Sequence, residues 1–534
     1  MASASATGRY PSLTPFPQLL SQVTQQNGAT DDAYLSVASF NLLAELYVRP
    51  HDLRTGAIQP FAAFQWISEE DTADILDIER RGPRLLASLR SCKADVMCLQ
   101  ELQLERVMVD SGGSSTSSNS KGHFVLPEWI RPIVTDEPYD IVLPPQSELD
   151  IIADRNIRVL GADVAVTCAV LFRRDCLQVV EEKFKGAKDI DTVTSVTVCL
   201  RGKNASQMAV RGPVAVTSIH LDATDERKRV GQLRRCLHRS RNFRSEREEL
   251  EPISALIAGD FNQECFSGSC VSAFLSNSGD GALVDEADLQ KECAAALRLK
   301  RNENPTEKQR KEWIDLYNES RDTAKDMCIS LNRVETCETR SAYDHETVDN
   351  GKHTMGQWRL DHIFYTSATL KPCAYWSTLE SDGESSIIGL PNRRYGSDHL
   401  PIGAIFRLLP TPKLSEDEKA ALLKIMKDIS NRQKRCIAER QTELDAELAA
   451  LEAKITPVAS VVFDSGSRKN NNEKNGPPPQ AIVDFMRKRR SVLRTLKDAQ
   501  KKERQQWIST LGNLERLTIT NACGLKCSQW VERG

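Results

Sequence analysis

Short hydrophobic runs alternate with longer amphipathic stretches through residues 31–410, and Gly, Pro, Asn or Asp bounds most of the runs. Runs of this length and composition predict β-strands, and the amphipathic stretch 74–90 predicts a helix. Strands that alternate with helices predict an α/β domain. Seven strands are predicted: Val37–Leu43, Asp95–Leu99, Ala162–Phe172, Val214–Leu221, Ala255–Ala258, Arg359–Tyr365 and Leu400–Phe406.

Three segments depart from this alternation. Residues 1–30 are rich in Ser, Thr and Gln and predict a disordered leader. Residues 111–122, with the sequence SGGSSTSSNSKG, predict a flexible surface loop. Residues 284–330 predict a helical insertion, in which Thr306 and Gln309 have the spacing of a capping box.

The sequence changes character after Pro410, and residues 411–534 predict a separate helical extension. Apolar residues follow one another there at spacings of seven, four, three and four, as in a heptad seam: Ile437, Leu444, Leu448, Leu451 and Ile455. A second helix is predicted over Ala481–Leu517, and the Asn- and Pro-rich residues 464–479 between the two predict a disordered hinge. Two helices joined in this way predict an α-helical hairpin.

Charge narrows the classes of function. The 534 residues include 71 Lys and Arg and 74 Asp and Glu, so the chain does not bind nucleic acid through bulk charge. The balance is uneven, because residues 411–534 hold 24 basic and 16 acidic residues. The run Arg487–Arg490 has three interpretations: contacts to RNA phosphates, a nuclear-localisation patch, or the solvated face of a helix.

Cysteine content and hydropathy bear on the compartment. Fifteen cysteines are too few for a disulfide scaffold in a chain of this length. Cys523 and Cys527 are four residues apart, but no second Cys pair or His cluster completes a zinc site, so the sequence predicts a reducing compartment. No apolar run approaches the roughly 18 residues of a transmembrane helix, so no membrane association is predicted. We expect a cytoplasmic protein, or a nuclear one through its basic run; the acid-free residues 1–30 leave organelle import as the alternative.

Polar residues stand at the ends of nearly all the predicted strands. A buried strand end is a costly place for a charge unless the charge is paired or binds a metal, so six such coincidences in one domain favour a shared site. The candidate site residues are Asn41, Glu101, His220, Asp260, Asn262, Asp361, Asp398 and His399.

These residue types suit hydrolysis of a phosphate ester. Glu101 and Asp398 offer the oxygen ligands that Mg²⁺ or Mn²⁺ prefers, whereas a Cys/His zinc set is absent from the sequence pattern. Asp260 is an acceptor that can hold or deprotonate an attacking water. Asn41 and Asn262 can orient water and phosphate oxygens, and His220 can donate to the phosphate. A carboxylate partner would orient an imidazole, and Asp361 can serve His399 if their strands are neighbours.

The motifs that carry these residues resemble the endonuclease/exonuclease/phosphatase superfamily, in the order and over the length (about residues 34–408) typical of it. They are Phe40-Asn41-Leu42-Leu43, Leu99-Gln100-Glu101-Leu102, Ser218-Ile219-His220-Leu221, Gly259-Asp260-Phe261-Asn262, Leu360-Asp361-His362-Ile363 and Ser397-Asp398-His399-Leu400-Pro401. The resemblance implies a four-layer α/β sandwich of two packed mixed β-sheets flanked by helices, here with the helical hairpin extension. It also implies a Mg²⁺-dependent phosphodiesterase or phosphatase.

The resemblance also implies roles for these residues. Glu101 would be the principal metal ligand, with Asp398 and Asp260 as further metal-binding acids. Asp260 with Asn262 would handle the nucleophile, Asn41 and His220 would contact the phosphate, and Asp361 would pair with His399. The set Asn41, His220 and Asn262 would thus bind substrate.

Two further motifs, Leu390-Pro391-Asn392 and Thr167–Phe172, resemble the branch of carbon-catabolite-repression deadenylases, nocturnin and angel proteins. Two positions depart from that branch. Ser218 stands where Thr is usual, and Gly356 stands where poly(A)-specific members have an aromatic residue that holds adenine. The sequence therefore predicts the phosphodiester chemistry without predicting a base preference.

The sequence predicts a Mg²⁺-dependent 3′-exoribonuclease of deadenylase-like type that releases nucleoside 5′-monophosphates from RNA. One alternative is a DNA-repair phosphodiesterase or a nucleotide or small-molecule phosphatase on the same site; Arg229 and Gln232 near the third motif would also suit a tyrosyl-DNA phosphodiesterase. The other is an RNA-complex scaffold that acts through the helical tail. Expected partners are an RNA substrate and a protein partner or second copy bound through residues 411–534.

Overall fold

A computed structural model describes nineteen stretches of the chain. These are residues 34–62, 64, 66–108, 122–182, 195–203, 214–245, 254–264, 269–276, 293, 305–326, 331–334, 340–349, 352–366, 369–375, 389–409, 431–450, 453, 480 and 483–495. The predicted leader at 1–30, the hinge at 464–479 and nearly all of the loop at 111–122 lie outside them. The chain divides into two compact units, of which the second comprises Asp326–Cys328 and Pro412–Gly534.

A seven-stranded mixed sheet forms one half of the first unit. Its strand order is β14 (Leu370–Tyr375), β15 (Ile402–Leu408), β1 (Tyr34–Asn41), β2 (Val96–Val107), β5 (Ala165–Arg173) and β4 (Tyr139–Val142), and β3 (His123–Val125) pairs with β2. The central strand β1 runs antiparallel to β15 and parallel to β2. All eight residues of β1 are buried, as expected for a strand with neighbours on both edges and packing on both faces.

A six-stranded mixed sheet forms the other half. Its order is β10 (Asn332–Arg333), β13 (Asp361–Tyr365), β9 (Ser254–Asp260), β8 (Val214–His220), β7 (Ser195–Gly202) and β6 (Leu177–Glu182). Only β8 and β9 are parallel neighbours, so their carboxyl ends lie at the same edge. A separate two-stranded ribbon consists of β11 (Arg340–Asp349) and β12 (Lys352–Trp358).

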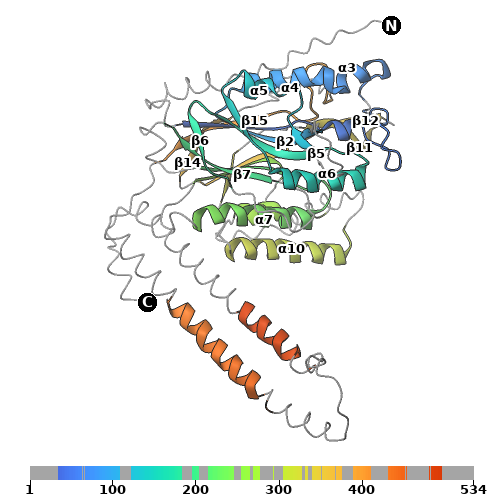
Figure 1. Ribbon diagram of the computed structural model, residues 1–534. Coiled ribbons are helices and arrows are strands. Elements are labelled where there is room, and N and C mark those ends of the chain that lie inside the picture. Colours follow the sequence, from blue (N-terminus) through green and yellow to red (C-terminus); the bar gives the residue numbers. More distant parts are fainter. Residues whose placement is uncertain are drawn as a thin grey trace, which may run out of the picture. The chain divides into compact units, whose positions relative to one another are not determined.

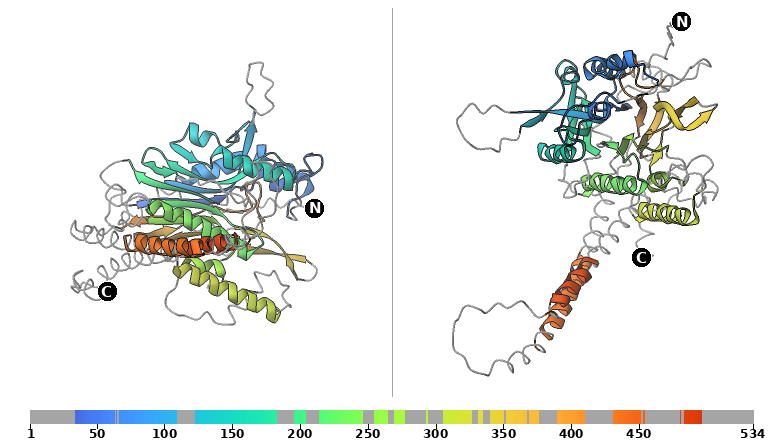
Figure 2. Two further views of the ribbon diagram at one scale, coloured as in Figure 1. Left: turned by 60° about the horizontal axis from the view of Figure 1, so that its bottom comes forward. Right: turned by 90° about the vertical axis from the view of Figure 1, so that its right-hand side faces the viewer.

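The two sheets pack face to face, and helices cover both outer faces (Figure 1). The first sheet carries α3 (Thr72–Leu76), α4 (Ile78–Cys92), α5 (Pro132–Thr135) and α6 (Gln146–Leu160). Against the second sheet pack α7 (Glu226–Ser245) and α8 (Cys270–Ser276), and α10 (Glu307–Asp326) lies along the outer side of α7 (Figures 1 and 2). Short helical turns, α2 (Glu45–Val48) and η2 (Glu69–Asp71), follow β1. The predicted four-layer α/β sandwich is thereby confirmed.

The hydrophobic core lies between the sheets and under the helices of the first sheet. One cluster of buried side chains draws on both sheets, for example Val37 and Leu99 from the first and Val216 and Ile363 from the second. The apolar faces of two sheets bury each other in this way because neither sheet can otherwise remove its inner face from water. The strand ends are therefore held in a rigid frame.

The seven predicted strands correspond to β1, β2, β5, β8, β9, β13 and β15. Their boundaries shift by at most three residues, except that β2 continues eight residues beyond Leu99 to Val107. The capping box is also confirmed, because Thr306 N donates to Gln309 Oε1 and Gln309 N to Thr306 Oγ1. The single helix expected over 74–90 is wrong. Asp77 has extended backbone angles and its side chain accepts from Glu79 N, so it ends α3 and caps α4.

The second unit contains two helical stretches, residues 431–450 and 483–495, which lie side by side (Figure 2). Arg489 forms an ion pair with Asp445 across the two helices, and Leu444 of the predicted heptad seam is fully buried. The seam positions Leu451 and Ile455 lie outside the described residues. The predicted hairpin is present. Among the described residues, no helix is long and apolar enough to cross a membrane.

Candidate active site

Strand register places the polar residues of the second sheet next to one another. His220 at the end of β8 pairs with Asp260 at the end of β9, and Asp361 at the start of β13 pairs with the same Asp260. In the first sheet, Asn41 at the end of β1 lies opposite Gln100 of β2, one residue before Glu101. Five of the six motifs therefore reach the same end of the sandwich.

Two buried side chains tie the sheets together just behind this end. Gln100 Nε2 donates to Ser218 Oγ at 2.9 Å, and Ser218 Oγ donates to the Leu99 carbonyl at 2.7 Å. Ser218 thus has a defined partner on the opposite sheet. Its hydroxyl provides partners for the Gln100 amide and the Leu99 carbonyl. Each of these polar groups, if buried without a partner, would destabilise the fold by about 1–3 kcal/mol.

A β-bulge directs the Glu101 side chain. The pairing of β2 with β5 shifts between Leu99 and Leu102, so that Gln100 and Glu101 together oppose Cys168. Glu101 has a positive φ of 54°, which is unfavourable for a residue with a side chain and is concentrated at functional sites. Its carboxylate accepts from Asn41 Nδ2 and from Ala44 N, each at 3.0 Å, which fixes both oxygens.

Asn41 joins the carboxylates of the two sheets. Its Oδ1 accepts from Leu43 N at 3.0 Å, and this hydrogen bond distinguishes the amide oxygen from the amide nitrogen. Its Nδ2 therefore points away and donates to both Glu101 Oε1 and Asp260 Oδ2 at 3.0 Å. Because Asn41 is fully buried, these bonds are shielded from competing water.

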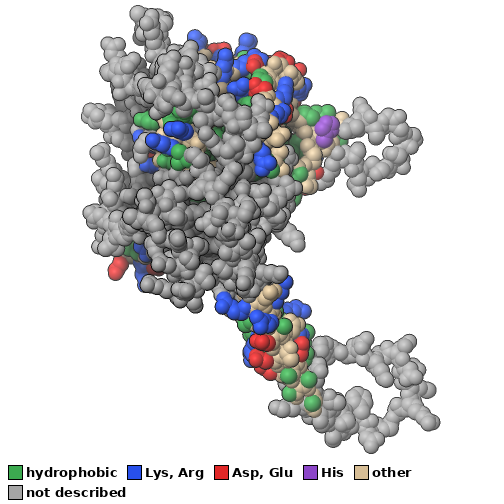
Figure 3. Space-filling model, turned by 90° about the vertical axis from the view of Figure 1, so that its left-hand side faces the viewer, with side chains coloured by type: hydrophobic (Ala, Val, Ile, Leu, Met, Phe, Trp, Pro, Cys, Tyr) green, Lys and Arg blue, Asp and Glu red, His purple; other side chains and the backbone are tan. Residues whose placement is uncertain are grey.

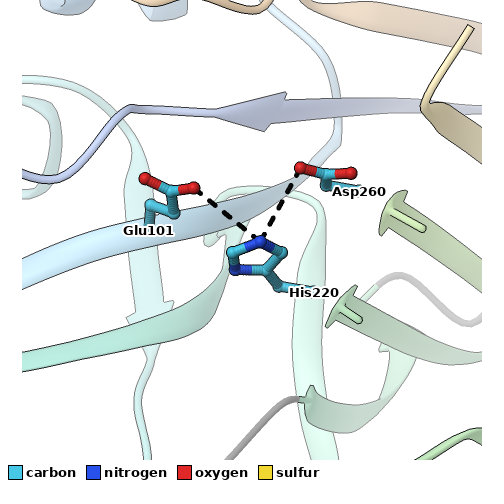
Figure 4. Close-up of side chains that lie close together, drawn as sticks. All are labelled: Glu101, His220 and Asp260. Carbon is cyan, nitrogen blue, oxygen red and sulfur yellow. Dashed lines mark ion pairs between the residues drawn. The ribbon is translucent and has the colours of Figure 1, made fainter. Parts of the chain in front are cut away.

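Glu101, His220 and Asp260 face one another across the gap between the sheets (Figure 4). His220 Nε2 lies 3.7 Å from Glu101 Oε1 and 3.7 Å from Asp260 Oδ2. The side chain of His220 is 25% exposed, compared with 11% for Glu101 and 2% for Asp260. His220 is therefore the member of the group that solvent, or a bound molecule, reaches most readily.

Asp260 lies at the centre of the cluster and is held ionised. Burial would raise its pKa, but His399 and His220 and hydrogen bonds from Asn262 N and Asn41 lower the pKa below its ordinary value. The backbone just before it allows no side chain: a Cβ on Gly259 would lie 1.8 Å from the Ile219 carbonyl oxygen. The close approach of β8 and β9, and hence of His220 and Asp260, requires glycine there.

His399 and Asp361 form a buried pair. His399 Nδ1 is 2.7 Å from Asp361 Oδ2, and its Nε2 faces Asp260 Oδ2 at 3.6 Å. Burial alone would lower the pKa of His399, but the carboxylates of Asp361, Asp260 and Asp398 outweigh burial and raise the pKa to about 10. In the metal-free protein the imidazole is therefore protonated near neutral pH, and its Nδ1 donates to Asp361 while its Nε2 faces Asp260 beyond hydrogen-bond distance. Asp361 and His399 therefore form the predicted pair.

This raised pKa makes stability depend on pH. A histidine whose pKa rises on folding stabilises the fold fully below its unfolded pKa, near 6.5, and loses that contribution as pH rises through its folded pKa, near 10. For the metal-free protein we expect the free energy of unfolding to fall between pH 6.5 and 10, by at most about 5 kcal/mol at 1.36 kcal/mol per pKa unit. Urea denaturation across this range measures it.

His399→Asn should flatten this dependence, whereas His123→Asn, at an exposed position on β3, should leave it unchanged. A wild-type stability that stays constant from pH 6.5 to 10 would contradict the protonated Asp361–His399 pair.

The two remaining predicted residues occupy different places. Asn262, with a φ of 50°, donates from its backbone N to Asp260 Oδ1 at 2.7 Å, while its Nδ2 donates to the Leu221 carbonyl at 2.9 Å. Its backbone N therefore orients Asp260. Asp398 is 8% exposed and acts on His399 through its charge.

Several residues that position the site carried no sequence signal of that role. Ser397 Oγ donates to the Asn41 carbonyl at 2.7 Å and accepts from His399 N, linking the last motif to the first. Arg229 and Gln232 on α7 bind the backbone of the turn after His220: Arg229 donates to Asp222 O, and Gln232 Oε1 accepts from Asp222 N. The sequence offered Arg229 and Gln232 as residues for a tyrosyl-DNA phosphodiesterase, but the side-chain contacts above are made within the fold.

The donor groups fit a divalent metal ion. Among the described residues, two groups of three side chains have ligand atoms within 4.8 Å of one another: Glu101, His220 and Asp260, and Asp260, Asp361 and His399. In the second group all three residues are buried, and His399 Nδ1 already binds Asp361 at 2.7 Å. The first group, with two carboxylates and a partly exposed imidazole, is the better metal site. Asp398, expected among the metal ligands, belongs to neither group.

Packed mixed sheets with carboxylates, amides and imidazoles at one end define a metal-dependent hydrolase of phosphoester bonds. Residues 38–399 match the model of the endonuclease/exonuclease/phosphatase family. The chain therefore belongs to this family, whose members are metal-dependent hydrolases that act on phosphoester bonds. The predicted superfamily and enzyme class are confirmed.

Three solved structures are similar to this chain at low sequence identity. ANGEL2, described as a 2′,3′-cyclic phosphatase and bound to adenosine-2′,3′-vanadate, has 19% identity and a TM-score of 0.40, with 70% of this chain and 96% of that chain covered. The human nocturnin catalytic domain with a bound sulfate has 16% identity and a TM-score of 0.33 (71% and 95% covered). Humanised D. rerio TDP2 has 15% identity and a TM-score of 0.31 (70% and 99% covered). No curated protein matches the chain in sequence.

Proposed function

We propose that this protein is a Mg²⁺-dependent phosphodiesterase that acts on RNA as a 3′-exoribonuclease and releases nucleoside 5′-monophosphates. The observation that supports the chemistry most directly is the junction at Asn41, where one amide nitrogen binds Glu101 and Asp260 from opposite sheets. Two carboxylates 3.7 Å from the same imidazole suit one divalent cation and one phosphate. Mn²⁺ would serve at the same ligands.

The residues divide the work of hydrolysis. Glu101 and Asp260 would hold a Mg²⁺ ion, which would supply Lewis-acid stabilisation of the negative charge that develops on the phosphate. Asp260, held ionised, accepts a hydrogen bond from the attacking water and orients it. His220, the most exposed of the three, donates to a non-bridging oxygen. Protonated His399, oriented by Asp361, supplies a positive charge beside the reacting centre.

A panel of labelled substrates tests the proposal. Purified full-length protein with Mg²⁺ should shorten 5′-labelled single-stranded RNA one nucleotide at a time and release nucleoside 5′-monophosphates, with poly(A) and mixed sequence compared directly. We expect turnover of RNA at least about tenfold faster than of DNA of the same sequence, since a site that binds a 2′-hydroxyl discriminates strongly against its absence. EDTA should abolish all turnover.

Other outcomes of the panel select the alternatives on the same site. Activity confined to abasic DNA or to a phosphotyrosyl link would replace RNA by a DNA-repair substrate. Activity confined to nucleotides, small phosphate esters or RNA with a cyclic phosphate end would make the enzyme a phosphatase. Either result would remove the exoribonuclease proposal and leave the roles of Glu101 and Asp260 intact.

The helical extension supports a second candidate function, that of a scaffold for RNA complexes. Arg487, Arg490 and Arg494 follow one another at helical spacings of three and four, and all three are exposed, as is Lys488. Lys488, Arg490 and Arg494 make no ion pair with another described residue. Basic side chains gather on this unit in the space-filling view (Figure 3). Exposed cations in this arrangement suit the phosphates of a single strand.

Salt dependence of binding tests this candidate. The triple variant K488E/R490E/R494E should weaken RNA binding and reduce the slope of log Kd against log salt by about 2, at about 0.7 per phosphate contact. K308E/K311E, at exposed positions on α10, is the charge-reversal control and should change neither. The scaffold would be favoured if the protein hydrolyses no phosphoester and loses RNA binding when residues 411–534 are removed. It would be excluded if the triple variant binds RNA as the wild type does. A protein partner or second copy bound through residues 411–534 remains a proposal.

A further inference from the structure

Arg81 on α4 is fully buried and binds three segments of backbone at once. Its Nε donates to the Leu76 carbonyl at 3.1 Å, and a single nitrogen, Nη1, donates to the Leu42 carbonyl at 3.1 Å and the Gly396 carbonyl at 3.2 Å. Its Nη2 is 3.3 Å from Glu45 Oε2. A guanidinium is costly to bury, and it is retained where its planar set of donors is fully used.

Two of these carbonyls belong to the segments that carry the site. Leu42 directly follows Asn41 and lies in the turn whose Ala44 N binds Glu101. Gly396 begins the segment that continues through Asp398 to His399. Glycine is needed there, because a Cβ on Gly396 would lie 2.8 Å from the Arg81 carbonyl oxygen and 3.0 Å from Leu85 Cγ. The segment 396–399 therefore lies directly on α4.

We propose that Arg81 is a positioning residue, which clamps the segment 396–399 to the end of β1 and so sets where Asp398 and His399 stand relative to Asn41 and Glu101. The Ser397 Oγ bond to the Asn41 carbonyl joins the same two segments and would by itself leave a single flexible link. Arg81 adds two bonds from one rigid group. Its charge also faces Asp398 and Glu101, which offsets part of the repulsion among the clustered carboxylates.

The conservative variant Arg81→Lys tests this role, because lysine keeps the charge and loses the planar set of donors. We expect kcat to fall about 10–100-fold with KM changed less than about threefold, since a displacement of about 1 Å can cost about 100-fold. Turnover is measured on whichever phosphoester the wild type hydrolyses fastest. Amide hydrogen exchange should rise in residues 389–401 and stay unchanged in β8 and β9.

Arg90→Met is the matched control. Arg90 lies on the same helix and its Nε pairs with Glu137, away from the segment 389–401, so both kcat and exchange in 389–401 should stay at wild-type values. The exchange measurement needs no substrate, so failure of the clamp and failure of the proposed RNA substrate are separate results.

A second variant keeps the inference testable if Arg81→Lys does not fold. Gly396→Ala leaves Arg81 in place and pushes the segment away from α4, so it should give the same loss of kcat and the same local rise in exchange. Wild-type kcat, or unchanged exchange in 389–401, in Arg81→Lys would overturn the proposal. If only Gly396→Ala folds, the same results in that variant would overturn it.

Discussion

Glu101→Gln should reduce phosphoester turnover by about 1000-fold or more while leaving the fold intact. The substitution removes the charge that binds the metal, and with the metal a stabilisation of the transition state of several kcal/mol. Each 1.36 kcal/mol lost corresponds to about a tenfold lower rate. Glutamine keeps the size of the side chain and an oxygen that can accept from Ala44 N. Steady-state turnover and a Mn²⁺ titration by calorimetry measure the two effects.

Glu105→Gln is the matched control, because Glu105 lies four residues further along the same strand and its side chain is exposed. Its turnover and metal affinity should equal those of the wild type. Full Mn²⁺ affinity in Glu101→Gln would show that Glu101 is not a metal ligand, even if activity falls.

Asp260→Asn should lower kcat by about 100- to 10,000-fold, the range that a positioned acid or base contributes. The variant also removes the carboxylate that faces His399 Nε2 at 3.6 Å, so the pKa of His399 should fall from its raised value toward the ordinary one. The loss of kcat and the lower pKa of His399 should therefore occur together. NMR titration of the histidine signals measures the pKa.

Asp315→Asn, at an exposed position on α10, controls for the change of charge and should alter neither quantity. An Asp260→Asn variant with a fallen rate and an unmoved His399 titration would mean that the two side chains do not interact in solution.

Candidate site residues can be placed from the sequence where strand register alone determines their position. His220, Asp260 and Asp361 come from neighbouring strands, and hydrophobic runs that end in polar residues are visible in the sequence. Glu101 was predicted as a site residue, but the direction of its side chain depends on a bulge opposite Cys168 that no local pattern announces. The family resemblance, rather than any spacing, supplied the expected roles.

Other features depend on contacts between residues far apart in the chain. The break at Asp77 interrupts a stretch with continuous helical periodicity, because its side chain caps the next helix instead. Arg81 looks in the sequence like one more surface arginine of an amphipathic helix. It is buried because loops fold over it, including the segment at Gly396, which lies 315 positions further along the chain.

The pairing of β1 with β15 has a consequence for how the enzyme arises during synthesis. The first strand of the catalytic unit remains without its antiparallel neighbour until residues 402–407 have left the ribosome. The last motif, with His399, emerges only just before them. A growing chain therefore carries most of its acidic groups long before they can be assembled, and hydrolytic capacity is acquired late, in a single step, once the final strand closes the first sheet.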